Sequence, residues 1–504
     1  MSAEKNPDSM YITAETQRQE HIQEPTIRRS SSSTSSTSAH NSFASASSTT
    51  VQALEFETMT AALASPTTVG ANLDSEKRDR DQPSPTYIAP PDGGYGWVVV
   101  GACFLNNFSM LGILLSWGIF QQLYTTEVYP GQVSAISWVG TLAFGCQYIV
   151  GSLFSLFAAR IGYRRMILMG AVLTAGGCVA ASFATKVWHL YLSQGVLFGV
   201  GAAMANPCVL AAPAQWFVRR RGLASGIAIS GSGIGGLAFS FIIQKMNATI
   251  GFRWCLRVLA IIVWCSMTIT GLLMRQFSTT GKQAVNVSMK DVQTMRQPTF
   301  LIMLLGVLMT SFGYFTSLNL MPSYAVDHGL SQSQGALLSS LLNGASFFGR
   351  FSGGLFGDRF GLINLLLICT ASCAFTTLIV WMLASSSLAV LVVYVVLYGL
   401  LGGGFISLLA PVLAEQFGTE SLTILVGVTF GINGVGSLTG TPIATAIFSS
   451  LGGGSSSDGS VGDLNAYRGA IGFAGGVIAV GALVFFVLKL KVGGKRKPVA
   501  VATA

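Results

Sequence analysis

One basic residue, Arg350, lies inside a long apolar stretch of the chain that runs from about residue 333 to residue 356. An ionised side chain within a membrane-spanning helix is costly, and residues of this kind commonly bind an ion or a charged substrate. The planar guanidinium can hold a carboxylate through two parallel hydrogen bonds. The alternative is that the long side chain only extends to the membrane surface. The residue type alone leaves both roles of Arg350 open.

Asparagine side chains in the apolar stretches extend this polar set. Asn343 precedes Arg350 by two helical turns on the same face, and Asn106 and Asn107 are neighbours in the first stretch. A single asparagine in a membrane helix often only bonds to a neighbouring helix, with about 0.6 kcal/mol on average. Together, however, they indicate a polar cavity. The predicted substrate-binding residues are therefore Arg350, Asn343, Asn106, Asn107 and Asn206.

The sequence carries no arrangement typical of an enzyme. All eight cysteines lie in apolar stretches, without the spacing of a metal site. No Gly-x-x-x-x-Gly-Lys-Ser/Thr loop is present to bind nucleotide phosphates, and the apolar stretches contain no nucleophile–base pair. We predict that the protein is not an enzyme and that it has no catalytic residue, metal or cofactor.

The elements that position these residues follow from composition. Of 504 residues, 51% are hydrophobic and 10% are charged, whereas soluble proteins carry about 25% charged residues. Apolar stretches of a length that crosses a bilayer recur from Trp97 onward. Twelve spans are predicted at 97–120, 134–158, 166–185, 189–210, 222–244, 254–274, 299–322, 333–356, 362–384, 388–411, 421–448 and 468–489.

The stretches divide the chain into two halves and a tail. We expect a disordered Ser/Thr-rich tail with kinase sites at 1–90 and an N-terminal six-helix half at 91–274. A linker at 275–298 is followed by a C-terminal six-helix half at 299–489 and a basic C-terminus at 490–504. The net charge of +9 comes from clusters between apolar stretches, which argues against nucleic-acid binding. The positive-inside rule places both termini in the cytoplasm. We expect a multi-pass protein of the plasma membrane, with Asn247 as its glycosylation site.

An internal repeat supports two related halves. The segment Leu156–Gly162 follows the second span, and Leu355–Gly361 follows the eighth in the same register. Each places an arginine and a glycine at a helix end that we expect to face the cytoplasm. The residues that we expect to act in gating at these positions are Arg160, Gly162, Asp358, Arg359 and Gly361.

Two motifs resemble those of the monocarboxylate porter family of major facilitator transporters. The first opens the first span and reads Asp92-Gly93-Gly94-Tyr95-Gly96-Trp97; the second precedes the fifth span and reads Trp216-Phe217-Val218-Arg219-Arg220-Arg221. The long Ser-rich tail is similar to that of the fungal branch. The resemblance implies an all-α major facilitator fold of twelve helices in two six-helix halves, and a binding arginine for the substrate carboxylate at Arg350.

The chain departs from the family's lactate carriers at two positions. Those carriers pair the arginine with an aspartate one turn earlier and use a lysine in the first span, where this chain has Ser346 and Leu114. We therefore expect weak coupling to protons. The function expected is secondary active or facilitative transport of a small anionic organic solute, such as a monocarboxylate or riboflavin, by alternating access. Efflux of a fungal secondary metabolite and solute sensing are the alternatives. The expected partners are the substrate and the lipid bilayer.

Overall fold

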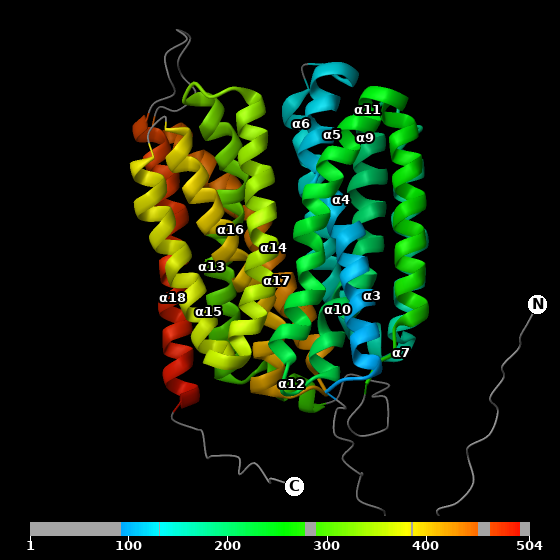
Figure 1. Ribbon diagram of the computed structural model, residues 1–504, viewed down its shortest axis with the longest axis vertical. Coiled ribbons are helices and arrows are strands. Elements are labelled where there is room, and N and C mark those ends of the chain that lie inside the picture. The colour runs from blue at the N-terminus through cyan, green and yellow to red at the C-terminus, as the bar shows by residue number, and fades with distance from the viewer. Residues whose placement is uncertain (1–91, 131, 278–288, 385–386, 452–463, 494–504) are drawn as a thin grey trace, which may run out of the picture. The chain divides into compact units, whose positions relative to one another are not determined.

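The computed structural model describes residues 92–130, 132–277, 289–384, 387–451 and 464–493. All of them belong to one unit, Ser84–Ala504. Every regular element within these ranges is a helix (Figure 1). The predicted disordered tail, the centre of the predicted linker and most of the predicted basic C-terminus lie outside the described residues.

The N-terminal half consists of six membrane-length helices, several of which contain π-helical turns (labelled η). Along the chain they are α3 Tyr95–Asn106, η2 Asn107–Leu111, α4 Gly112–Leu115, α5 Trp117–Leu123, η3 Tyr124–Val128, α6 Val133–Gly145, η4 Cys146–Val150, α7 Gly151–Ile161, α8 Tyr163–Ala181, α9 Val187–Leu190, η5 Tyr191–Leu197, α10 Phe198–Trp216 and α11 Arg221–Leu273. The last of these is two helices joined at Gly251, whose φ of 77° turns the chain back.

The C-terminal half follows a short helix that the sequence did not predict, α12 Met289–Met295. Its own elements are α13 Pro298–Asp327, α14 Gln332–Phe360, α15 Leu362–Phe375, η6 Thr376–Trp381, α16 Leu388–Phe417, α17 Leu422–Ser450 and α18 Leu464–Gly493. A buried apolar cluster fills each half, and that of the C-terminal half reaches across the boundary to Tyr148, Leu210 and Ile229.

The expected number of spans is confirmed within the described ranges. Ten helices there are long and apolar enough to cross a membrane. Counting α11 twice and adding α14 gives twelve. The helix α14 is less apolar because it carries Arg350, Asp358 and Arg359, and it packs between α11 and α16 rather than facing lipid all round. A helix shielded in this way needs a narrower apolar face than one surrounded by lipid.

The two halves meet at close range along α11 and α14. A Cβ atom on Gly222 would lie 2.5 Å from the carbonyl oxygen of Gly354, and one on Gly226 would lie 2.6 Å from that of Arg350. Only glycine permits this approach, as is usual for tightly packed membrane helices. The helix α17 makes the second junction by packing against α7, η4 and α10.

The internal repeat is visible in the backbone. Gly162 ends α7 with φ 83° and ψ 144°, and Gly361 ends α14 with φ 90° and ψ 131°. In both places a left-handed glycine lets the next helix begin at once.

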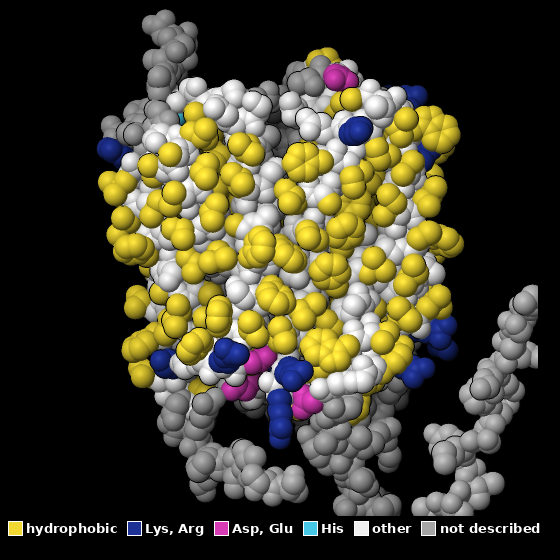
Figure 2. Space-filling model, viewed as in Figure 1, with side chains coloured by type: hydrophobic (Ala, Val, Ile, Leu, Met, Phe, Trp, Pro, Cys, Tyr) yellow, Lys and Arg dark blue, Asp and Glu magenta, His cyan; other side chains and the backbone are white. Residues whose placement is uncertain are grey.

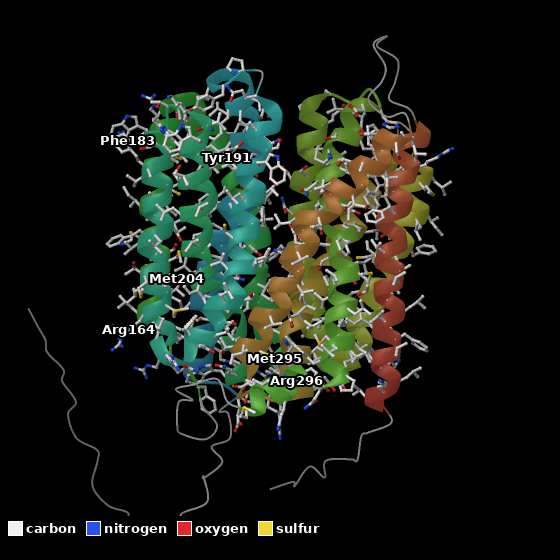
Figure 3. The ribbon with its side chains drawn as sticks, turned by 180° about the vertical axis from the view of Figure 1, so that it is seen from behind. Arg164, Phe183, Tyr191, Met204, Met295 and Arg296 are labelled. Carbon is white, nitrogen blue, oxygen red and sulfur yellow. The ribbon has the colours of Figure 1, made fainter. Side chains whose placement is uncertain are left out.

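One end of the bundle is rich in charge. Figure 2 shows Lys, Arg, Asp and Glu side chains gathered at its lower edge and hydrophobic side chains over the middle. Seen from behind, Arg164 and Arg296 lie at this end, and Phe183 and Tyr191 lie toward the other (Figure 3). We call it the basic end, defined by Arg160, Arg164, Arg296 and Arg359.

Candidate functional site

Arg350 lies at the boundary between the two halves and is 6% exposed. Its Nη1 donates a hydrogen bond to the hydroxyl of Ser232, which belongs to α11 in the other half. Its Nε is buried and has no hydrogen-bond partner. No ion pair of Arg350 is found among the described residues. The guanidinium is therefore a buried positive charge whose partners among the described residues are neutral, and whose Nε is left unpaired.

Two tyrosines surround this charge. The guanidinium is close enough for its charge to act on the phenols of Tyr148 and Tyr314. Tyr148 comes from η4 in the N-terminal half and stacks on Phe430 of α17, with ring centroids 5.9 Å apart. Tyr314 comes from α13 and stacks on Tyr398 of α16 at the same centroid distance of 5.9 Å. Side chains of α11, η4 and α13 thus lie near Arg350, and rings of α16 and α17 pack behind the two tyrosines.

Buried polar atoms without partners continue the site. Gln147, beside Tyr148, donates from Nε2 to Oδ1 of Asn206 at 3.5 Å, while its own Oε1 has no partner. Asn433, one turn after Phe430, has no partner for either amide atom, and neither does the hydroxyl of Ser346. An unsatisfied polar atom inside a membrane protein costs several kcal/mol. Such atoms point to a site that binds a polar solute.

The structure places the predicted asparagines in different surroundings. Asn206 lies beside Gln147, and Asn343 faces α11 at Gly236 on the same side of α14 as Arg350. Asn107 instead donates to the carbonyl of Ala228 at 2.8 Å and holds the first helix against α11. Asn106 is fully buried and contacts Met110. The substrate-binding role of all four stays a prediction.

Sequence reasoning missed Ser232, Tyr148, Tyr314 and Gln147. Hydroxyl and phenol groups are common in membrane helices and carry no charge. Residue type alone therefore does not distinguish these four from the many similar side chains in the predicted spans. A usable signal was the pair Gln147–Tyr148, which places two polar side chains side by side in an apolar stretch.

The two sequence motifs form one contact at the basic end. The carboxylate of Asp92 accepts hydrogen bonds from the backbone N–H groups of Val218 and Arg219, at 2.6 and 3.0 Å. The rings of Trp97 and Phe217 pack with centroids 4.7 Å apart. A Cβ on Gly96 would lie 3.0 Å from the ring of Phe217, so glycine is needed there. The first motif therefore positions the loop that the second motif forms.

Gly94 lies at a turn, and Asn247 lies within a helix. Gly94 adopts φ 55° and allows α3 to begin at the next residue, Tyr95. Asn247 lies within α11, one turn before Gly251, and both of its amide atoms are buried without a partner. Its glycosylation stays a prediction.

Asp358 joins the halves at the basic end. Its carboxylate accepts hydrogen bonds from the backbone N–H groups of Gly222 and Leu223, at 2.7 and 2.9 Å. These N–H groups belong to the first turn of α11, where backbone N–H groups have no hydrogen-bond acceptor within the helix. The neighbouring Arg359 and its repeat equivalent Arg160 are both exposed.

The equivalent junction at α17 is neutral. The hydroxyl of Tyr163, at the start of α8, is hydrogen-bonded to the hydroxyl of Thr423 at the start of α17. Nε2 of Gln215 donates to the same Tyr163 oxygen at 2.9 Å. Both junctions are formed, so the structure has its two halves joined at the basic end.

Comparison with known proteins identifies the class. The model of the Major Facilitator Superfamily matches residues 97–386 and 303–503. The chain is 32% identical over 393 residues to the MFS transporter asaE of Aspergillus flavus, covering 76% of this chain and 87% of the relative. The chain belongs to the Major Facilitator Superfamily.

Two further likenesses are one in sequence and one in fold. The Fujikurins efflux protein of Gibberella fujikuroi is 27% identical, covering 79% of this chain and 85% of the relative. The crystal structure of the transporter FucP in its outward conformation shares the fold with a TM-score of 0.59 at 13% identity, covering 78% of this chain and 98% of that one. The protein is thus a multi-pass membrane transporter of this superfamily.

Proposed function

We propose that this transporter carries an organic anion and that Arg350 binds the anionic group. The observation that supports this proposal is the buried guanidinium of Arg350. It donates a hydrogen bond to the neutral Ser232, and its Nε has no partner. A buried charge that lacks a counter-charge costs several kcal/mol. A substrate anion supplies that counter-charge, and the surrounding tyrosines offer it hydroxyl groups and aromatic faces.

Two features bear on the kind of anion and its coupling. The motifs that begin at Asp92 and Trp216 resemble those of the monocarboxylate porter family, which supports a carboxylate substrate and membership of that branch. Ser346 and Leu114 stand where the lactate carriers have titratable groups. We infer that transport is only weakly coupled to protons, so any dependence on pH follows the ionisation of the substrate itself.

Export of a fungal secondary metabolite is the second candidate. It is favoured by the relatives named as the Fujikurins efflux protein of Gibberella fujikuroi and the Aspyridones efflux protein of Emericella nidulans. Both candidates use the same site, because an acidic metabolite also presents an anion to Arg350. Export predicts that cells with the transporter accumulate less of the labelled compound than cells without it.

The proposed orientation places the basic end in the cytoplasm of a plasma-membrane protein. This follows from the positive-inside rule, since Arg160, Arg164 and Arg359 lie at that end. In the alternating-access cycle the junctions at Asp358 and Tyr163 separate when the site opens toward the cytoplasm.

The test is flux through the purified full-length protein in proteoliposomes. Labelled aliphatic and aryl carboxylates are compared with their neutral amides. We expect the carboxylates to be carried in preference, and Arg350→Ala to abolish their transport without changing the melting temperature in detergent by more than a few degrees. Arg253→Ala, at an exposed position, is the matched control. Carboxylate flux through Arg350→Ala at the wild-type KM would overturn the proposal.

A further inference from the structure

The Arg350 guanidinium has one nitrogen bonded to Ser232 and another, Nε, without a partner. A guanidinium offers a carboxylate two edges with paired N–H groups, one formed by Nη1 and Nη2 and one formed by Nε and Nη2. Ser232 accepts one N–H of Nη1, so it competes with a ligand at the first edge. Nε is buried and has no partner, so the N–H of Nε at the second edge remains for a ligand.

Ser232 is itself held in place. Its hydroxyl donates its only proton to the backbone oxygen of Ile229, at 2.6 Å. Toward Arg350 it can therefore act only as an acceptor, and its position is fixed by the helix α11. The residue is 1% exposed, so water does not compete for the contact.

We propose that Ser232 is a positioning residue, which holds Nη1 so that the Nε–Nη2 edge of Arg350 receives the substrate carboxylate side-on. This inference rests on the proposed function. It names the recognised group as a planar carboxylate with two oxygens, rather than any anion. Because Tyr148 and Tyr314 flank the guanidinium, an aryl-substituted carboxylate is the matching class.

The inference also links binding to conformation. Ser232 belongs to the N-terminal half and Arg350 to the C-terminal half, so their hydrogen bond exists only while α11 and α14 lie together. Separation of the halves at the basic end removes the hydroxyl and frees the guanidinium to rotate. The affinity for a carboxylate is then lower in the state that is open at the basic end than in the state seen here.

The experiment uses full-length protein in proteoliposomes, with labelled 4-phenylbutyrate and its neutral analogue 4-phenylbutyramide as probes. Ser232→Ala should raise KM for 4-phenylbutyrate about tenfold, the size expected when a hydrogen bond to a charged group is lost. The maximal rate should change less than about threefold. Ser232→Thr, which keeps the hydroxyl, should restore most of the affinity. Arg350→Lys should remove the preference for the carboxylate, because an ammonium lacks the paired N–H edge.

Ser230→Ala is the matched control. Ser230 is also buried on α11, and its hydroxyl bonds to the carbonyl of Ile227 at 2.8 Å, as Ser232 bonds to Ile229. If Ser232→Ala behaves like Ser230→Ala while Arg350→Ala is inactive, the positioning role is overturned and the proposed function stands. If wild-type protein does not prefer 4-phenylbutyrate to the amide, or Arg350→Ala transports it normally, the proposed function fails and this inference fails with it.

Discussion

The two junctions that join the halves at the basic end occupy equivalent places in the internal repeat but differ in chemistry. At one, the carboxylate of Asp358 accepts two hydrogen bonds from the first turn of α11. At the other, the hydroxyls of Tyr163 and Thr423 bond to each other, with Gln215 as a third member. The repeat position of Asp358 is Ala159, which has no carboxylate to offer.

The difference shows that the repeat preserves backbone geometry more strictly than chemistry. Gly162 and Gly361 have nearly the same dihedral angles, so both helix ends turn alike. A carboxylate at a partly buried helix N-terminus contributes up to about 2 kcal/mol, whereas a neutral hydrogen bond contributes about 1 kcal/mol. We expect the Asp358 junction to dominate closure of the basic end.

The largest effect is expected from Asp358→Ala. It leaves the N–H groups of Gly222 and Leu223 unpaired and should raise the population open at the basic end about tenfold. The measurement is the maleimide labelling rate of Ser225→Cys, a buried position on α11 next to the junction, in a Cys265→Ser background. Asp358→Asn, with one acceptor oxygen left, should fall between Asp358→Ala and the parent. An unchanged rate in Asp358→Ala would show that this junction does not control closure.

A smaller effect is expected from Tyr163→Phe, which breaks the neutral junction. Gln215 also donates to Thr423 at 3.4 Å, so part of the junction survives the loss of the hydroxyl. We expect the same labelling rate to rise about threefold, equivalent to about 0.7 kcal/mol. Tyr191→Phe is the control, since that hydroxyl bonds to Ala135 within one half. A rise as large as that of Asp358→Ala would remove the distinction between the two junctions.

Most of the fold could be predicted from sequence because it depends on the lengths of apolar stretches. The bilayer thickness fixes span length, so the predicted spans match the helices closely. The junction within α11 was predicted less well. The break was expected across about residues 245–253, whereas the helix runs on to Gly251 and turns at that one residue. As a result Asn247, placed by the sequence in a loop, lies in a helix.

The candidate site could be predicted only in part. The cost of burying an ionised group singled out Arg350, because that cost depends on residue type alone. The partners of Arg350 depend on the rotation of each helix, which is altered by π-helical turns that add a residue and shift the faces. Asn107 lies in η2, and Gln147 and Tyr148 lie in η4. A projection at 3.6 residues per turn therefore misplaces these side chains.

The smallest effect, and the one of opposite sign, is expected from Ala159→Asp. This substitution gives the repeat position in the N-terminal half the residue that the C-terminal half has at Asp358. By that equivalence it supplies a carboxylate for the start of α17. We expect the labelling rate at Ser225→Cys to fall about twofold in the parent and to recover part of the rise caused by Asp358→Ala. Ala159→Asn, of similar shape but without charge, is the matched control. If the aspartate and asparagine variants label at the same rate, no charged contact forms at α17, and the asymmetry of the two junctions lies in the helix packing as well as in the missing acid.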